Sequence, residues 1–388
     1  MSTPDSPKPI YNVKNPFIAK VKKAYDLSGP DAPKNTRHYE IDLSGSGLEY
    51  LPGDSLAVQP TNDPVLVEDT LAALGFSGDE VVEHPKQKGV EVTIRQAFTE
   101  ACVLTEPDKK LMNAIVEKTH QASPLTDLLL PDNKEQLQNY LWGRYVIDLL
   151  QENPGITFEP GEFVKLLKKL NIRLYSISSS LKAHPEEVHL TVATVRYESH
   201  GRVRGGVAST FLSDRITVGE TPIPVFVNLG KGFRLPEPEE DVPVIMCGPG
   251  TGIAPFRSFL EERKATSAKG GAWLFFGEVS CNSCFFYKDE FEAYLADGTL
   301  TKLTTAWSRD QAEKIYVQHK MVEESAEFWQ WLEEGAIFYV CGDASRMAVD
   351  VDKALHTIIE KEGGKSPEEA AAYVQQMKDD KRYRRDVY

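Results

Sequence analysis

Along the first part of the chain, the spacing of apolar residues changes from a period of two to a helical period. His38–Leu43 alternates polar and apolar residues, and Leu51–Asp54 predicts a turn before a short strand at Ser55–Val58. Val65–Leu74 and Leu137–Leu150 instead have helical spacing, and an Asp-Pro pair before the first is typical of an N-cap and first-turn proline. The pattern predicts strands followed by a mainly helical segment.

Strand-like patterns return at Arg173–Ser178, Val188–Tyr197 and Pro224–Val227, so a helix-rich segment interrupts a β-rich domain. A linker at Leu235–Glu240 follows, and beyond it apolar strands alternate with helical stretches. The expected strands are Val244–Cys247, Ala272–Phe276, Thr301–Ala306 and Phe338–Cys341. The expected helices lie near Ala254–Lys264, Lys288–Ala296, Tyr316–Leu332 and Ala344–Glu362. This alternation predicts a doubly wound parallel sheet whose ligands bind at the carboxyl ends of its strands.

The patterns divide the chain into five segments. They are a tail at 1–14, a first β-rich part at 15–62, a mainly helical connecting segment at 63–170, a second β-rich part at 171–235 and an α/β domain at 241–388. We expect a multidomain protein of mixed α+β and α/β class.

Composition narrows the functions that are compatible with this organisation. The 388 residues carry a formal net charge of −14, which argues against nucleic-acid binding, because phosphate contacts need a basic surface. No apolar run approaches the length of a membrane span, and the first residues lack the pattern of a signal peptide. The five cysteines are too few and too scattered for a disulfide framework, so we expect a cytoplasmic protein.

Cys281 and Cys284 have C-x-x-C spacing, which is compatible with a redox dithiol or with two ordinary thiols at the end of a strand. A zinc site would need two more ligands, and the sequence has no second such pair. We expect no metal site, and ordinary thiols.

The most informative motif is Cys247–Phe256, in which a glycine-rich turn follows the apolar run Val242–Met246 and opens a helix. Glycines let the backbone approach a ligand closely, and the helix N-terminus offers N–H groups to phosphate. A second glycine turn opens a helix at Gly205–Leu212. Each turn is also compatible with a purely structural role.

Two groups of polar residues follow or occupy strands. Arg173 and Tyr175 share one strand face, where a guanidinium suits a pyrophosphate and a ring stacks on a flat heterocycle; an ion pair and a surface tyrosine are the alternative. Ser308-Arg309, with Lys314 and Tyr316 beyond, predicts a pocket for a 2′-phosphate, against the alternative of a basic surface loop.

Together these motifs closely resemble the FAD/NADPH module of the diflavin reductases, within the ferredoxin–NADP+ reductase superfamily. The likeness is greatest to the flavoproteins of NADPH-dependent sulfite reduction and runs from about Asn15 to the printed end. It rests on Arg-Leu-Tyr-Ser at 173–176, Gly-Pro-Gly-Thr-Gly-Ile-Ala-Pro-Phe-Arg at 248–257, Ala-Trp-Ser-Arg-Asp-Gln at 306–311, Lys-Ile-Tyr-Val-Gln at 314–318, Tyr-Val-Cys-Gly-Asp-Ala at 339–344 and the final Arg-Arg-Asp-Val-Tyr.

The resemblance implies an antiparallel FAD-binding β-barrel with a helical insertion, followed by an NADPH-binding domain. Arg173 would bind the FAD pyrophosphate, Tyr175 would stack on the flavin, Ser176 would lie near flavin N5, and Tyr388 would cover the other flavin face. The remaining implied FAD residues are Leu174, Thr191, Val192, Ala193, Tyr197, Gly206, Val207, Ala208 and Ser209.

For NADPH, the resemblance implies that Ser308 and Arg309 bind the 2′-phosphate. The other implied NADPH residues are Gly250, Thr251, Lys314, Ile315, Tyr316, Val317, Gln318 and Asp350. Ser176, Cys341 and Asp386 would form the group that assists hydride transfer.

The implied function is an FAD enzyme that takes a hydride from NADPH and passes single electrons to a separate acceptor, as the flavoprotein component of assimilatory sulfite reductase. Diflavin reductases carry an FMN domain before this module, but the printed sequence begins only a short tail before the first strand, so we expect none here. The acceptor would be a sulfite reductase hemoprotein, a flavodoxin or a ferredoxin. A general NADPH–flavodoxin or NADPH–ferredoxin reductase is the alternative, and a non-catalytic interaction subunit is a more remote one.

Overall fold

The computed structural model describes residues 11–119 and 124–388, which fold as two compact units. Unit 1 comprises the residues up to Val58 together with Leu174–Ala193 and Thr217–Tyr388, and unit 2 comprises Gln59–Arg173 and Thr194–Ile216. Within the described residues, no helix has both the length and the apolar character needed to cross a membrane.

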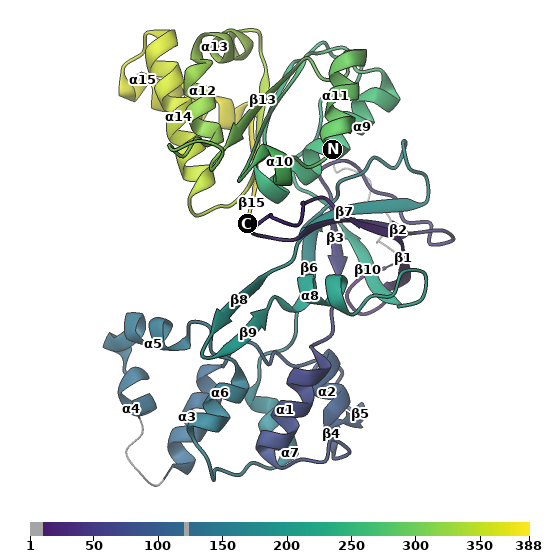
Figure 1. Cartoon of the computed structure of the whole chain (residues 1–388), viewed down its shortest axis with the longest axis vertical. Coiled ribbons are helices and arrows are strands. Elements are labelled where there is room, and N and C mark those ends of the chain that lie inside the picture. The colour runs from purple at the N-terminus through teal and green to yellow at the C-terminus, as the bar shows by residue number, and fades with distance from the viewer. Residues whose placement is uncertain (1–10, 120–123) are drawn as a thin grey trace, which may run out of the picture. The chain divides into compact units, whose positions relative to one another are not determined.

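Six antiparallel strands form the first sheet, in the order β6-β3-β10-β1-β2-β7 (Figure 1). Their bounds are β1 Phe17–Asp26, β2 Thr36–Asp42, β3 Ser55–Val58, β6 Arg173–Ser176, β7 Glu187–Ala193 and β10 Ile223–Asn228. A single bridge between Ile177 and Leu190 brings the two edges of the sheet together, as a barrel requires. Alternate residues of β10 are buried, because side chains of a strand point in turn to each face.

Unit 2 is mainly helical and also contains two small hairpins. Its helices are α1 Pro64–Leu74, α2 Ile94–Glu100, α3 Lys109–Lys118, α4 Pro124–Leu128, η1 Pro131–Asn133, α5 Lys134–Leu141, α6 Val146–Glu152, α7 Pro160–Leu166 and α8 Val207–Asp214. Its strands are β4 Val81–Glu83 paired with β5 Glu91–Thr93, and β8 Arg196–Ser199 paired with β9 Arg202–Gly205.

The prediction of α1 with its N-cap is confirmed, since the Asp63 side chain accepts a hydrogen bond from the Val65 N–H. The prediction of one helix over Leu137–Leu150 is wrong. The chain breaks between α5 and α6, where Gly143 has a φ of +71° and Asp148 accepts from the backbone N–H of Tyr145.

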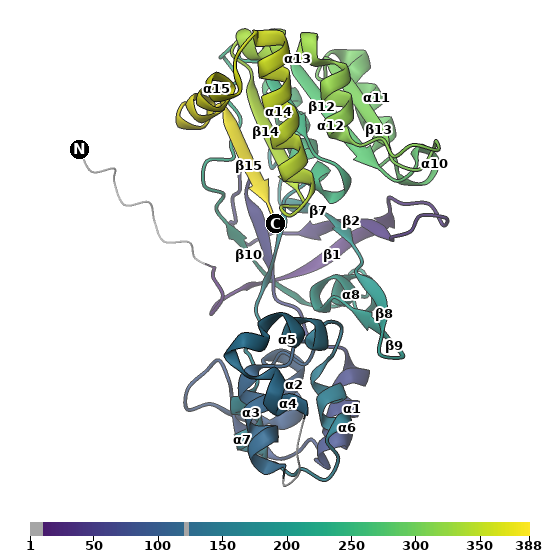
Figure 2. The same cartoon turned by 90° about the vertical axis from the view of Figure 1, so that its left-hand side faces the viewer.

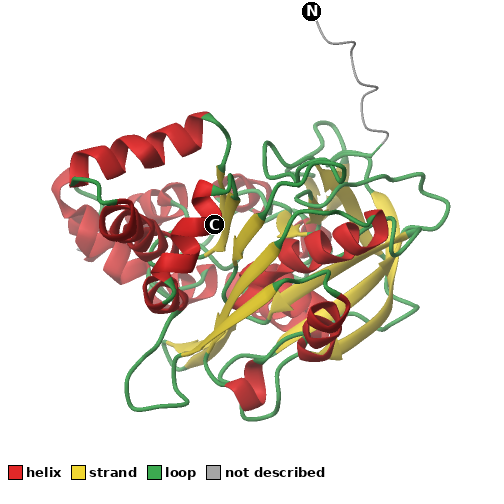
Figure 3. Cartoon of the chain, turned by 90° about the horizontal axis from the view of Figure 1, so that it is seen from above, coloured by secondary structure: helices red, strands yellow, loops and turns green. Residues whose placement is uncertain are grey.

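The second sheet of unit 1 is parallel and has the order β13-β12-β11-β14-β15. Its strands are β11 Val244–Cys247, β12 Ala272–Glu278, β13 Lys302–Trp307, β14 Ile337–Gly342 and β15 Tyr383–Val387. Helices cover both faces, and this confirms the predicted fold class (Figures 2 and 3).

One face of the parallel sheet packs against the C-terminal helices, and the other against the helices that follow β11 and β12. The first group is α12 Val317–Glu323, α13 Ser325–Glu333, α14 Met347–Gly363 and α15 Pro367–Asp379. The second is η2 Gly250–Ile253, α9 Ala254–Thr266, α10 Cys281–Cys284 and α11 Lys288–Asp297.

The structure differs from four further expectations. The helix expected over Tyr316–Leu332 is two helices that meet at Glu324, and the strand expected over Val188–Tyr197 is divided between β7 and β8. Cys281 and Cys284 lie in the short helix α10 rather than at a strand end. The last residues, for which no strand was expected, form β15 at the edge of the parallel sheet.

A buried arginine joins the barrel to the parallel-sheet domain within unit 1. Arg257 of α9 donates hydrogen bonds to the carbonyl of Ser178 at 2.7 Å and to Glu290 at 2.7 Å, and pairs with Glu261 at 2.9 Å. Its side chain is 6% exposed. Burial by itself lowers the pKa of Arg257, but the two carboxylates outweigh this effect and raise it. The cation is therefore fully compensated where the two sheets meet.

Two buried histidines beside Arg257 are held neutral. Burial first, and then the charge of Arg257, lowers the pKa of His38 to about 2 and that of His189 to about 4, from an ordinary value of 6.5. His184 shows the opposite shift, because its hydrogen bond to Glu261 raises its pKa despite its partial burial.

We expect these histidines to make the chain sensitive to acid. Between about pH 6.5 and pH 4, unfolding lets His38 and His189 take up protons, so the free energy of unfolding falls as pH falls, by up to about 1.4 kcal/mol per pH unit for each histidine. Urea unfolding followed across this pH range measures the slope. His38→Gln, which keeps a polar partner for Tyr287, should flatten the slope, whereas substitution of exposed His200 should not. An equal slope in wild type and His38→Gln would contradict the assignment.

Candidate active site

The glycine turn lies at the carboxyl edge of the parallel sheet, between β11 and α9. The chain turns at Gly248-Pro249, forms the short helix η2 and continues into α9 without a side-chain cap at Pro249. An uncapped helical start leaves backbone N–H groups for an anionic ligand. The turn therefore has the form that the sequence predicts for a phosphate-binding loop.

The three glycines of this turn are needed for different physical reasons. A Cβ on Gly248 would lie 2.5 Å from the Gly252 carbonyl oxygen, and one on Gly252 would lie 2.2 Å from the Cys341 carbonyl oxygen, so both are required by packing inside the protein. Gly250 has a φ of +59°, and a Cβ there would meet only Glu278, at 3.5 Å. Gly250 alone borders open space where a ligand would approach.

Ser176, Cys341 and Asp386 lie together although they come from distant parts of the sequence. The Ser176 hydroxyl donates to Asp386 Oδ2 at 3.0 Å, and the β14–β15 register places Cys341 opposite Asp386. Complete burial, with the nearby Asp386 charge, raises the pKa of the Cys341 thiol, so this group is a neutral thiol. The structure thus assembles the predicted catalytic group, whose chemical role stays a prediction.

Tyr388 lies beside the glycine turn. Its backbone N–H donates to the Gly342 carbonyl, its carbonyl accepts from Ala344, and its hydroxyl is 3.1 Å from Thr251 Oγ1. The side chain is 56% exposed. The ring thus lies at the surface beside the glycine turn, which is compatible with the predicted flavin-covering role.

The predicted 2′-phosphate residues lie on the loop after β13. The backbone N–H groups of Ser308 and Arg309 donate to the carbonyls of Glu278 and Val279, which fix the start of this loop against the end of β12. Arg309 and Lys314 are exposed, and Tyr316 is 42% exposed. These side chains are placed to meet an anion from solvent.

Not every predicted NADPH residue presents a side chain there. Val317, the first residue of α12, is buried in the core, so its side chain cannot contact a nucleotide, and half-buried Ile315 packs against the same cluster. Gln318 is half-buried in α12. Asp350 lies in the first turn of α14, 3.3 Å from Lys353.

The predicted FAD residues of unit 1 lie on β6 and β7. Leu174 is 44% exposed, and Tyr175 is half-buried. Thr191 places its hydroxyl 2.6 Å from that of buried Tyr287, and Val192 is 2% exposed. The side chains of Thr191 and Val192 are therefore both buried inside unit 1, on opposite faces of β7, whereas Ala193 at the end of this strand is half-buried.

Unit 2 carries the remaining predicted FAD residues. Gly206 is the N-cap of α8, which confirms the helix predicted after the second glycine turn, and no side chain caps this N-terminus. Ser209 donates to the Gly206 carbonyl and accepts from Val195 N–H, so its hydroxyl holds the turn, and Ala208 is buried. The groups of this turn that suit a phosphate are therefore the backbone N–H groups of Val207–Ser209.

Arg173 and Tyr197 of unit 2 are exposed, as contact with a cofactor requires. Tyr197 has a second aromatic ring beside it, because the Trp142 ring centroid is 6.0 Å away. Trp142 is 67% exposed and was not predicted as a site residue. The signal in the sequence was weak, since a Trp-Gly pair in an expected helix gives no indication of a ligand.

Glu278 was also not predicted, although it lies at the carboxyl end of β12. Its Oε2 accepts from Val279 N–H at 2.6 Å, and burial raises its pKa. The Phe-Phe-Gly run before it marked a buried strand end, but nothing in the sequence showed that this end borders Gly250.

Comparison with known proteins agrees with this geometry. The FAD binding domain family matches residues 10–211, just over half of the chain, and the oxidoreductase NAD-binding domain matches residues 246–353. The chain belongs to the FAD binding domain family, and it carries the NAD-binding domain of oxidoreductases beside it. These matches confirm the prediction of a flavin and a nicotinamide nucleotide as cofactors.

The chain is similar to the protein named "Sulfite reductase [NADPH] flavoprotein alpha-component" of several bacteria. Identity is 47% over 378 residues with the Bacillus subtilis protein, 44% over 378 residues with a Vibrio cholerae protein and 43% over 380 residues with the Zymomonas mobilis protein. Each match covers 97% of this chain and 60 to 62% of the relative. The chain thus spans about three fifths of the length of these curated relatives, and the predicted resemblance is confirmed.

The hydrogen bond between Ser176 and Asp386 predicts coupled effects on hydride transfer. Ser176→Ala and Asp386→Asn should each slow flavin reduction by NADPH at least tenfold, about 1.4 kcal/mol, because each removes a group that orients the other. Stopped-flow absorbance at saturating NADPH measures the rate. The double variant should be slowed by less than the product of the single effects. A single-variant rate within about twofold of wild type, with FAD still bound, would remove that residue from the catalytic group.

Arg309 should discriminate between the two nicotinamide nucleotides. Arg309→Ala should weaken NADPH binding about tenfold to a hundredfold and leave NADH nearly unaffected, because only NADPH carries the 2′-phosphate that a guanidinium binds. Titration with each nucleotide separates the two effects. Lys288→Ala removes an exposed cation of α11, paired at 3.7 Å with Glu292, and serves as the control. Equal losses with both nucleotides would refute the assignment.

Proposed function

We propose that this chain is an NADPH-oxidising flavoenzyme that passes electrons from bound FAD to a separate acceptor protein in sulfite reduction. The observation that carries the proposal is the assembly of Ser176, Cys341 and Asp386 at the carboxyl edge of the parallel sheet, beside the glycine turn. A half-buried hydroxyl–carboxylate pair beside a fully buried thiol, gathered from three segments, is typical of a reaction site rather than of a structural core.

The chain's own residues would position the reactants and control charge. Bound FAD would supply hydride acceptance and single-electron release. The uncapped starts of α8 and of the η2–α9 segment would hold phosphates through backbone N–H groups. Arg309 would bind the 2′-phosphate, and the neutral Cys341 thiol would add no negative charge beside Asp386. Asp386 would orient the Ser176 hydroxyl through the hydrogen bond that joins them.

The relatives' names support sulfite reduction over a general NADPH–flavodoxin or NADPH–ferredoxin reductase. We propose a sulfite reductase hemoprotein as the final acceptor, reached directly or through a flavodoxin or ferredoxin. All five cysteines are free thiols, which supports a reducing compartment and hence the predicted cytoplasmic location.

Reconstitution tests this proposal. The purified chain should carry FAD. When NADPH is mixed with the protein under anaerobic conditions, the flavin absorbance should bleach. Sulfide should form from sulfite only when a sulfite reductase hemoprotein is added, with or without a flavodoxin-like carrier. Measuring NADPH consumption and sulfide release together links the two half-reactions.

Each half of the proposal fails on a different result. A colourless chain that binds no flavin would favour the non-catalytic interaction subunit. Reduction of ferredoxin or flavodoxin with no sulfide formed in the presence of the hemoprotein would favour the general reductase. Sulfide production by the chain alone would overturn the need for a separate acceptor.

A further inference from the structure

A carboxyl group lies beside the glycine turn, where a negative charge would oppose an anionic ligand. Glu278 ends β12, and its half-buried side chain places Oε1 3.5 Å from where a Cβ of Gly250 would lie. Gly250 is the glycine of the turn that borders open space. An ionised carboxylate here would repel the pyrophosphate of a nicotinamide nucleotide that approaches the turn. A bound phosphate therefore favours the state of Glu278 that carries no charge.

The two carboxyl oxygens of Glu278 have different surroundings. Oε2 accepts a hydrogen bond from the Val279 N–H at 2.6 Å, which fixes the direction of the side chain. Oε1 has no hydrogen-bond partner among the residues that the structure describes. When the group is protonated, Val279 keeps Oε2 as the acceptor, so the proton is on Oε1, the oxygen that faces Gly250.

The surroundings of Glu278 already favour its neutral form. Burial raises the pKa of Glu278 above its ordinary value of 4.5, and a backbone hydrogen bond and the charge of exposed Lys34 offset only part of this effect. Arg309 and Asp310 follow β13, the strand that pairs with β12, and Asp310 accepts from the Cys281 N–H at 2.8 Å. A phosphate brought beside Glu278 adds a negative charge and raises its pKa further.

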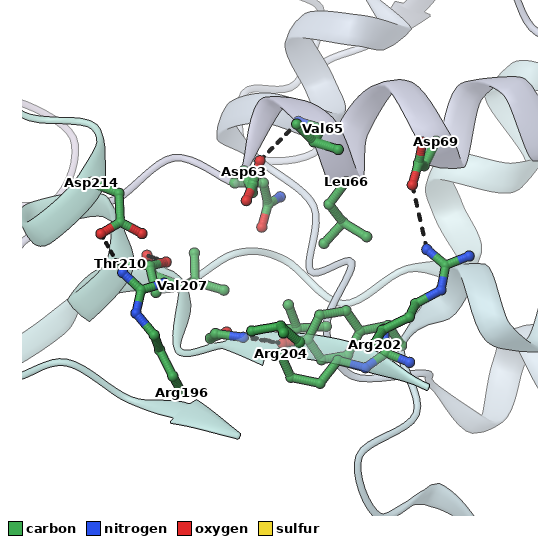
Figure 4. Close-up of a pocket in the computed structure, with 15 residues that line it drawn as sticks. Asp63, Val65, Leu66, Asp69, Arg196, Arg202, Arg204, Val207, Thr210 and Asp214 are labelled. Carbon is green, nitrogen blue, oxygen red and sulfur yellow. Dashed lines mark hydrogen bonds and ion pairs between the residues drawn. The ribbon is translucent and has the colours of Figure 1, made fainter. Parts of the chain in front are cut away.

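The carboxylates that line a cavity of about 310 Å³ in unit 2 differ from Glu278 in this respect (Figure 4). Asp69 pairs with Arg202 at 3.4 Å, Asp214 pairs with Arg196, and Asp63 caps helix α1. Each of these carboxylates has a partner within unit 2, whereas the carboxyl oxygen beside the glycine turn has none in the described part of the chain.

We propose that Glu278 binds the pyrophosphate of the nicotinamide nucleotide as a neutral carboxylic acid, with Oε1–H donating to a phosphate oxygen. Nucleotide binding then takes up a proton from solvent at Glu278, and the proton returns to solvent when the nucleotide leaves. A hydrogen bond to an anion is stronger than one between neutral groups, which offsets the cost of protonation. This inference rests on the proposed function, because it takes the glycine turn to be the nucleotide site.

Titration of the FAD-loaded chain with NADP+ tests the inference, since the oxidised nucleotide binds without reducing the flavin. Glu278→Gln keeps the size of the side chain and an oxygen for the Val279 N–H, and its amide N–H donates to a phosphate at every pH. The variant should tighten NADP+ binding at least about fivefold at pH 8 and less at pH 6, because proton uptake costs wild type up to about tenfold in affinity per pH unit. The 2′-phosphate of NADP+ titrates in both proteins and cancels in the ratio of the two affinities.

Isothermal titration in two buffers of different ionisation enthalpy counts the protons directly. Near pH 7.5, wild type should take up more protons per NADP+ than Glu278→Gln, by roughly half a proton or more. Glu292→Gln removes an exposed carboxylate of α11 and should reproduce wild type in both measurements. Unchanged flavin absorbance and thermal unfolding midpoints show that both variants are folded.

Three results would overturn the inference. Parallel pH profiles with equal proton uptake in wild type and Glu278→Gln would mean that the carboxyl is not protonated on binding. Weaker NADP+ binding by Glu278→Gln at every pH would mean that the site needs the ionised carboxylate. An equal gain in Glu292→Gln would reduce the effect to overall charge. Failure of the wild-type chain to bind NADP+ would instead refute the nucleotide site itself, and with it the proposed function.

Discussion

The architecture of unit 1 depends on the compensation of one buried cation. Arg257 contacts Ser178 and His189 of the barrel and Glu261 and Glu290 of the parallel-sheet domain, and losing either carboxylate would leave part of the buried charge uncompensated. Arg257 lies one turn into the helix that follows the glycine turn, and Ser178 lies two residues beyond Ser176. The same contacts that join the two domains therefore also fix the distance between Ser176 and the edge where Cys341 and Asp386 lie.

Close backbone packing is the second constraint on this edge. Gly252 lets η2 approach β14 so closely that any side chain would strike the Cys341 carbonyl, and the parallel pairing of β14 with β15 then sets Asp386 beside it. Burial keeps the thiol neutral and raises the pKa of Glu278, while Asp343 is engaged by the backbone N–H groups of Arg346 and Met347. Both effects reduce the negative charge that an anionic dinucleotide would meet at this edge, in a chain with a net charge of −14.

Much of the candidate site could be predicted because its chemistry is concentrated in short contiguous motifs. The predicted alternation of strands and helices gave the correct positions for three of these motifs. They are the glycine turns, the pair Ser308-Arg309 and the strand that ends in Cys341. Buried members of these motifs were harder to interpret. Val192, Val317 and Ser209 were predicted as site residues. The side chains of Val192 and Val317 are buried in the core, and the Ser209 hydroxyl holds a turn. Periodicity shows that a residue is on a strand or helix, but not which neighbours occupy its polar atoms.

By itself, the sequence determined the order of the domains, the parallel sheet and the helix starts at Asp63 and Gly206, because periodicity, caps and glycine turns are local properties. The cofactor class followed from the resemblance of its short motifs to a known family. Only the tertiary structure decided the break at Gly143, the edge strand β15, the hydrogen bond that joins Ser176 to Asp386 and the neutral histidines around Arg257. Each depends on contacts between residues far apart in the chain. Burial, register and desolvation at such contacts arise only when the whole chain has folded.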